Sequence, residues 1–163
     1  MMINKNISTS WKLIISILVC ETVGFTSGLL SMIEMNSWFN TLNVPSWNPP
    51  SYLFGPIWTF LYFILGVSFW LIWKSNIPKP IKSKAQLLFL VQLFFNFLWS
   101  ILFFKFHSPF LAFVDITLMI VITLAIILCF FQISPLAALL LVPYLSWICF
   151  AVVLNYNIWF LNK

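Results

Sequence analysis

Aromatic and amide side chains recur at helical spacing in three apolar runs of the sequence. The three stripes consist of Trp58, Tyr62 and Gly66, of Gln92, Asn96 and Trp99, and of Tyr144, Trp147, Ala151 and Asn155. Residues three or four positions apart share one face of a helix. Indole and phenol rings offer flat apolar faces and amides offer hydrogen-bond partners, so the stripes are candidates for the lining of a pocket inside the bundle. The alternative is that these side chains pack and hydrogen-bond between helices without forming a pocket.

Conventional acid–base or metal chemistry finds little support in the sequence. The acidic residues are Glu21, Glu34 and Asp115, and the one histidine is His107. They form no carboxylate pair, nucleophile–base set or cluster of metal ligands, so we predict no metal site. His107 is expected in a loop, with haem ligation as the alternative. Glu21 falls inside an apolar run, where a carboxyl group either marks a proton or ion path or is protonated or bonded to an amide inside the bundle.

The composition places these runs in a bilayer. The chain has 163 residues, of which 63% are hydrophobic and 7% charged, and this is more apolar surface than a soluble core of this size buries. Runs of the roughly 20 residues that a spanning helix requires occur at 12–33, 55–74, 84–106, 109–131 and 135–160. Pro56, Pro109 and Pro135 are expected in first turns, where a helix tolerates proline. We predict an all-α membrane protein: a five-transmembrane-helix bundle that forms one domain over residues 1–163, with a long loop at 34–54.

The placement of lysines predicts the orientation of the bundle. All eight basic residues are lysines, and six of them lie before the first run or around the polar loop 74–84. Because basic residues accumulate on the cytoplasmic side, we expect a multi-pass plasma-membrane protein with a cytoplasmic N-terminus and with the loop 34–54 outside. The net charge of +5 then reflects topology and attraction to anionic lipid. With no arginine and no basic face, the chain is not expected to bind nucleic acid.

The loop 34–54 has the composition of a rigid lid. Trp38, Phe39 and Leu42 can share one face of a short interfacial helix. The chain after them is stiffened by Pro45, Pro49 and Pro50. The alternative for the aromatic residues is an interfacial belt. The start of the second run and the end of the fifth lie on the same side of the membrane as this loop, so we expect a pocket that opens beneath it.

Three segments of the chain resemble the signatures of the translocator protein family, also called peripheral benzodiazepine receptors or tryptophan-rich sensory proteins. They are "WFNTLNVPSWNPPSYLFGPIWTFLY", "QLFFNFLWS" and "PYLSWICFAVVLNY". The resemblance is to a bacterial member and spans nearly the whole chain. It implies a homodimeric five-helix bundle that binds tetrapyrroles such as protoporphyrin IX, with no cofactor required. In animal relatives it also implies binding of cholesterol and of isoquinoline carboxamide or benzodiazepine drugs.

The resemblance and the helical stripes together predict the ligand-binding residues. Those implied by the family are Gly24, Ser27, Phe54, Gly55, Trp58, Asn96, Trp99, Trp147, Ala151 and Leu154. The stripes and the loop add Trp38, Pro45, Trp47, Tyr62, Tyr144 and Asn155.

Two positions depart from the pattern of the animal relatives. Leu111 replaces a tryptophan, which would weaken or widen part of the ligand wall. In "VLNYNIWFLNK", Phe160 replaces an arginine and Lys163 follows Tyr156 too late to complete the proposed cholesterol motif. Specific cholesterol binding is therefore not expected.

The resemblance also implies that some bacterial relatives promote light-dependent oxidative breakdown of bound porphyrin, and this activity is a hypothesis for the present chain. Its catalytic residues would be Trp58 and Trp147, because an indole in contact with an excited porphyrin can donate an electron. The alternative function is a transporter of porphyrins or other small hydrophobic molecules, for which the sequence offers no inverted repeat. Gly24 and Gly28 form a G-x-x-x-G pattern that serves helix packing, the pocket wall or a dimer interface.

Overall fold

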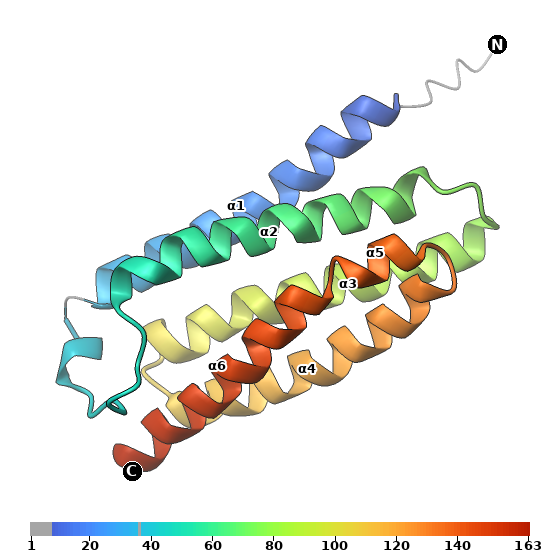
Figure 1. The fold of residues 1–163 in the computed structure, drawn as a ribbon. Helices are drawn as coiled ribbons and strands as arrows, with labels where there is room; N and C mark the ends of the chain where they lie inside the picture. The colour runs from blue at the N-terminus through green and yellow to red at the C-terminus, as the bar shows by residue number, and fades with distance from the viewer. Residues whose placement is uncertain (1–7, 36) are drawn as a thin grey trace.

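The computed structural model describes residues 8–35 and 37–163, and this part of the chain is helical, without a β-strand. Five helical segments within it are long and apolar enough to cross a membrane. They run side by side along a common long axis, and the first residues of α1 lie at the opposite end of the bundle from the last residues of α6 (Figure 1). The prediction of an all-α membrane protein with five spanning helices is confirmed.

The described part of the chain contains six α-helices and two short helical turns. Their bounds are α1 Thr9–Met35, η1 Phe39–Thr41, α2 Ser51–Lys74, α3 Lys79–Ser100, η2 Ile101–Lys105, α4 Pro109–Phe131, α5 Pro135–Leu139 and α6 Val142–Leu161. The third span combines α3 with η2, a π-helical turn, and the fifth span combines α5 with α6. We use "α1–α2 loop" for residues 37–50, which contain η1.

Three helices begin earlier than the sequence indicated, and α1, which starts at Thr9 in place of residue 12, differs least. α2 follows directly on Pro50, whose missing N–H costs nothing at a helix start. Pro56 therefore lies in the second turn of α2, and its prediction as a first-turn residue was wrong. Likewise α3 begins at Lys79 after Pro78. The polar residues 79–84, predicted as loop, are helical because lysine and serine do not terminate a helix.

The fifth span is broken where the sequence predicted one helix over 135–160. α5 ends at Leu139 and α6 begins at Val142, with Pro143 in its first turn. Proline lacks the N–H that would bond to the carbonyl of Leu139 in a continuous helix, so the break falls one turn before Pro143.

The half of the bundle away from the α1–α2 loop is filled by side chains. The ring of Phe89 on α3 stacks on Phe69 of α2 at 4.8 Å and on Phe130 of α4 at 6.1 Å between centroids. α1 crosses α2 closely here, since a Cβ at Gly66 would lie 2.7 Å from the Ile17 Cα. The other half of the bundle contains the cavity described next.

Candidate ligand-binding site

A cavity of about 560 Å³ lies inside the half of the bundle that carries the α1–α2 loop. Residues of α1, α2, α3, η2, α4 and α6 line it, together with Phe39 and Asn48 from the loop above. Protein pockets for small molecules measure roughly 300 to 1,000 Å³ and are mostly apolar. The cavity has the size and the lining of such a pocket.

Aromatic rings from two sides form its walls. On the α2 and α6 side, Trp147 meets Trp58 edge to face with ring centroids 6.3 Å apart, and Phe54 meets Trp147 in the same way at 6.2 Å. On the α3 and η2 side, Trp99 stacks parallel to Phe103 at 5.1 Å. The spacing of four between Phe54 and Trp58 on α2 places both rings on the cavity face. These walls offer indole and phenyl surface to a flat ligand.

A buried hydrogen-bond network joins α2, α3 and α6 at the deep end of the cavity. The Tyr62 hydroxyl donates to Asn96 Oδ1, and Asn96 Nδ2 donates to the Tyr144 hydroxyl oxygen at 2.7 Å. Gln92 Nε2 also donates to that oxygen. Tyr62 and Asn96 line the cavity, while Tyr144 and Gln92 lie behind them. The amides of this stripe therefore connect helices, which is the alternative that the sequence left open.

Asn155 makes a second polar connection near the mouth. Its Oδ1 accepts a hydrogen bond from Trp99 Nε1 at 3.0 Å, and its Nδ2 donates to the Pro109 carbonyl at 2.7 Å. One amide thus joins α6 to α3 and to the start of α4. Because Trp99 is held through its N–H, the face of its indole remains directed at the cavity.

The polar character of the cavity follows from one carboxyl group and a few hydroxyl and amide groups. Among the described lining residues, Glu21 is the one ionisable acid, and no lysine, arginine or histidine lines the cavity. The Ser27 hydroxyl is buried, lines the cavity and has no hydrogen-bond partner in the described part of the chain. The interior therefore suits the neutral part of a ligand, and a carboxylate is better accommodated at the mouth, near water.

The α1–α2 loop is fastened over the mouth by contacts with the bundle. The Trp38 ring stacks on His107 with centroids 4.3 Å apart, and His107 Nε2 lies 3.1 Å from a carboxylate oxygen of Glu34. His107 lies in the turn between η2 and α4 with a left-handed φ of 49°, so its prediction as a loop residue is confirmed. It does not line the cavity.

The far part of the loop is tied to α6. The Asn43 N–H donates to Asn162 Oδ1 at 2.9 Å, and Asn162 Nδ2 donates to the Asn43 carbonyl at 2.8 Å. The Trp47 ring meets Phe150 edge to face at 5.8 Å. These contacts hold the loop down on the bundle, where Phe39 and Asn48 close the cavity from above.

Most of the residues predicted for the site surround this cavity. Those that line it are Gly24, Ser27, Phe54, Gly55, Trp58, Tyr62, Asn96, Trp99, Trp147, Ala151, Leu154 and Asn155. Trp38, Pro45, Trp47 and Tyr144 are not among the lining residues: Trp38 and Trp47 fasten the loop, and Tyr144 is fully buried in the polar network.

The two glycines of the G-x-x-x-G pattern have different surroundings. A Cβ at Gly24 would collide with the Tyr62 ring, whereas a Cβ at Gly28 would meet nothing within 4 Å. Both glycines line the cavity. Gly24 is thus needed for close packing of α1 on Tyr62, whereas the space beside Gly28 is open.

Several other lining residues could not be predicted from residue types or spacing. Phe103 and Phe104 are both buried against the cavity because η2 winds as a π-helical turn, which no residue type in this segment indicates. Ile116 and Met119 are apolar residues in an apolar helix, so nothing in the sequence distinguishes them from their neighbours. Leu111, taken as part of the ligand wall, is exposed on α4 and does not line the cavity.

The fold and the cavity define a class of protein: an integral membrane protein of five spanning helices with an internal, aromatic-walled cavity beneath a fastened loop. A comparison with known protein families leads to the same class of protein. The profile of the TspO/MBR family matches residues 16–160, and the chain belongs to this family.

Relatives from three branches of life are similar over most of the chain. Tryptophan-rich protein TspO of Archaeoglobus fulgidus is 38% identical over 151 residues, which are 93% of this chain and 97% of the relative. Tryptophan-rich sensory protein of Cereibacter sphaeroides is 31% identical over 154 residues, or 93% and 92% of the two chains. The human translocator protein is 38% identical over 123 residues, or 75% and 73%.

Proposed function

We propose that the protein is a membrane receptor or sensor that binds a tetrapyrrole such as protoporphyrin IX in the cavity. The observation that carries this proposal is the pair of aromatic walls, Trp58 with Trp147 on one side and Trp99 with Phe103 on the other. A porphyrin is flat and apolar over most of its area, so stacking on indole and phenyl faces suits it. Isoquinoline carboxamide and benzodiazepine drugs share this flat aromatic character.

The polarity of the cavity sets the orientation of such a ligand. Because no basic side chain is among the described lining residues, the deep part of the cavity offers no counter-charge to the two carboxylates of protoporphyrin. They lie at the mouth, where Asn48 and water provide hydrogen bonds. The apolar edge of the ring then points toward Tyr62 and Met119.

A titration of purified protein in lipid nanodiscs with protoporphyrin IX tests this proposal. We expect saturable quenching of tryptophan fluorescence at one ligand per chain. Replacing Trp58 or Trp147 by Ala removes part of a wall and raises Kd by about tenfold, as expected for roughly 1 to 3 kcal/mol of stacking. The matched control is Trp70→Ala, because Trp70 lies outside the cavity. Non-saturable quenching, or equal effects at Trp58 and Trp70, would refute the proposal.

A photochemical activity of the same site is supported by the contact between the Trp58 and Trp147 rings. When light excites the bound porphyrin, an indole donates one electron to the ring, dissolved oxygen adds to the reduced ring, and the electron returns to the indole radical cation, so that both oxygen atoms remain in the ring-opened product. Illumination should bleach the porphyrin absorbance, and the double variant Trp58→Phe with Trp147→Phe should bleach more slowly. Equal bleaching rates at equal occupancy would exclude a catalytic role for these tryptophans.

Transport is the alternative function, and the packing of the bundle favours binding over it. The network of Tyr62, Asn96 and Tyr144 ends the cavity at its deep side, and the Phe69, Phe89 and Phe130 rings fill the bundle beyond. A transporter requires a route through both halves of the membrane. Flux of protoporphyrin into sealed proteoliposomes would favour transport instead.

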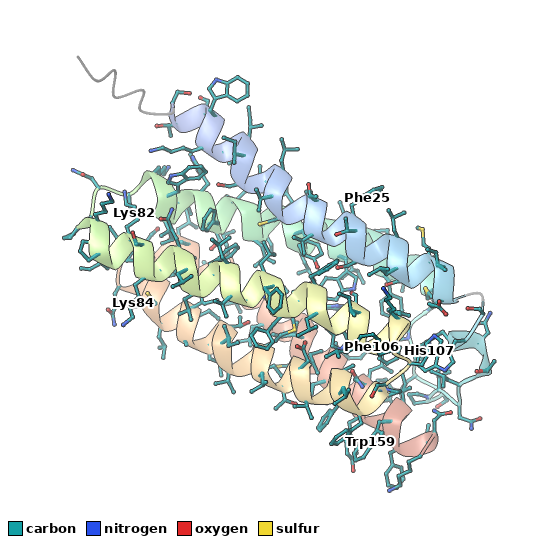
Figure 2. The ribbon with its side chains drawn as sticks, turned by 180° about the vertical axis from the view of Figure 1, so that it is seen from behind. Phe25, Lys82, Lys84, Phe106, His107 and Trp159 are labelled. Atoms are coloured by element: carbon teal, nitrogen blue, oxygen red, sulfur yellow. The ribbon has the colours of Figure 1, made fainter. Side chains whose placement is uncertain are left out.

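The proposed orientation puts the N-terminus in the cytoplasm of a plasma membrane. Figure 2 shows Lys82 and Lys84 at one end of the bundle and His107 and Trp159 toward the other. The lysine-rich end is the cytoplasmic one by the positive-inside rule. The protein is proposed to be a homodimer by analogy with its relatives, and a crosslinking experiment in nanodiscs tests this.

A further inference from the structure

The cavity reaches the lipid-facing surface of the bundle on one side. Most of its lining residues are buried or half-buried, but six are exposed, and all six belong to two helices. They are Phe25, Leu29 and Met32 on α1 and Ser51, Gly55 and Thr59 on α2. The exposed fractions of Phe25 and Met32 are 68% and 69%. In Figure 2, Phe25 lies at the edge of α1, on the outer surface of the bundle.

Helical periodicity places these residues on two facing stripes. Phe25, Leu29 and Met32 repeat at the three- and four-residue spacing of one helix face, and Ser51, Gly55 and Thr59 repeat every four residues. The opposite flank of α1, which includes Val23 and Leu30, contributes no residue to the cavity lining in the described chain. The opening is therefore specific to the side of α1 that meets α2.

The surroundings of four glycines show where α1 and α2 are in contact and where they are separated. Near the middle of the membrane, Gly66 lets α2 touch the backbone of Ile17, and Gly24 lets α1 touch Tyr62. Because the two helices are antiparallel, the register that pairs Gly66 with Ile17 brings Gly55 level with Gly28. A Cβ at either of these glycines would meet nothing within 4 Å. The helices are thus in contact at depth and separated near the α1–α2 loop.

The rim of this opening is compatible with hydrocarbon. The Thr59 hydroxyl donates to the Gly55 carbonyl at 3.0 Å, and the Ser31 hydroxyl donates to the Ser27 carbonyl at 2.9 Å. Their polar groups are satisfied within their own helices, so an apolar molecule passes them without competing for hydrogen bonds. The mouth under the loop, in contrast, is covered by Phe39 and Asn48 and fastened through Asn43 and Asn162.

We propose that the slot between α1 and α2, bounded by Phe25, Leu29 and Met32 on one side and Ser51, Gly55 and Thr59 on the other, is a lateral portal through which a hydrophobic ligand passes between the bilayer and the cavity. In taking a tetrapyrrole as the ligand, the inference rests on the proposed function. The portal lets a membrane-dissolved ligand reach the site without release of the loop. Its chemistry selects molecules that partition into lipid.

Binding kinetics in nanodiscs test the portal with protoporphyrin IX. Gly55→Trp and Gly28→Phe place rings in the open space of the slot, and we expect both the association and the dissociation rate to fall by about tenfold or more. A substitution that merely damaged the binding site would accelerate dissociation instead. The control Val121→Trp adds the same ring on the exposed face of α4 and should leave both rates unchanged.

Loosening the loop distinguishes the two routes. Asn162→Ala removes both hydrogen bonds to Asn43, and with a lateral portal it leaves the rates unchanged. If Asn162→Ala accelerates both rates while Gly55→Trp changes neither, ligand passes under the loop and the portal is refuted.

A labelling experiment tests the portal without any porphyrin. Ser27→Cys places a thiol on the cavity wall in a chain whose three native cysteines, Cys20, Cys129 and Cys149, are replaced by alanine. A bilayer-soluble maleimide should label it, a charged methanethiosulfonate should not, and Gly55→Trp should slow the maleimide about tenfold, relative to Val121→Trp. Labelling by the charged reagent as fast as by the maleimide would refute the portal. If this labelling pattern is obtained but protoporphyrin does not bind, the proposed function fails and the portal stands.

Discussion

The packing of Gly24 against Tyr62 yields a stability prediction with an internal control. Gly24→Ala and Gly28→Ala make the same chemical change on the same helix, four residues apart. At Gly24 the new methyl group collides with the Tyr62 ring, and at Gly28 it meets no atom within 4 Å. Any gain in helix propensity, about 1 kcal/mol for Gly→Ala, is common to both variants and cancels when they are compared.

The magnitude follows from the surroundings of Tyr62. This side chain is buried, with 2% of its surface exposed, and its hydroxyl donates to Asn96. Its ring can move away from a new methyl group only by straining that hydrogen bond or the neighbouring core. Overpacking of this kind costs about 1 to 3 kcal/mol. Gly24→Ala should therefore be less stable than Gly28→Ala by about 1 to 3 kcal/mol.

Equilibrium unfolding in mixed micelles, followed by near-UV circular dichroism, measures this difference. Because both variants keep the same helix and the same lipid environment, a common change in detergent interaction does not affect the comparison. Equal free energies of unfolding for the two variants would refute the close contact between Gly24 and Tyr62. A Gly24→Ala variant that is more stable than Gly28→Ala would be even stronger evidence against this contact.

Two further substitutions test the helix packing and the hydrogen bonds around the cavity. Gly66→Ala should destabilise the protein by about 1 to 3 kcal/mol. The new Cβ would lie 2.7 Å from the backbone of Ile17, and a backbone atom cannot rotate away as a side chain can. An unchanged unfolding midpoint would contradict this packing. Asn155→Leu removes the partners of the Trp99 N–H and the Pro109 carbonyl and should cost about 1 to 3 kcal/mol. Near-UV circular dichroism should also show a more mobile Trp99 indole, and an unaltered spectrum would contradict the proposed role of Asn155.

The number and nature of the spanning helices could be predicted because hydropathy acts over whole runs of about 20 residues. The range 109–131 matches α4 because Pro109 and a serine cap mark its start. Helix ends elsewhere were less accurate, since Pro56 and the lysines after Pro78 are compatible with either a helix or a loop.

The cavity itself was only partly predictable. Spacing placed Trp58, Asn96 and Trp147 on inward faces, and these residues line the cavity. Spacing could not tell which amide faces a ligand and which joins helices, because both uses need the same residue on the same face. Phe103 and Phe104 belong to a π-helical turn, and no residue pattern in this segment predicts such a turn, so their place in the wall could not be predicted.

The central claim is that a flat ligand occupies the cavity, and filling the cavity tests it most directly. Ala151 lines the cavity on α6, and Val153, two residues away, is exposed on the outside of the same helix. The dissociation constant of protoporphyrin IX in nanodiscs should rise by about tenfold or more with Ala151→Phe, for an expected loss of at least roughly 1.4 kcal/mol, and stay unchanged with Val153→Phe. Unchanged affinity in a folded Ala151→Phe variant would show that the ligand binds elsewhere and would contradict this account.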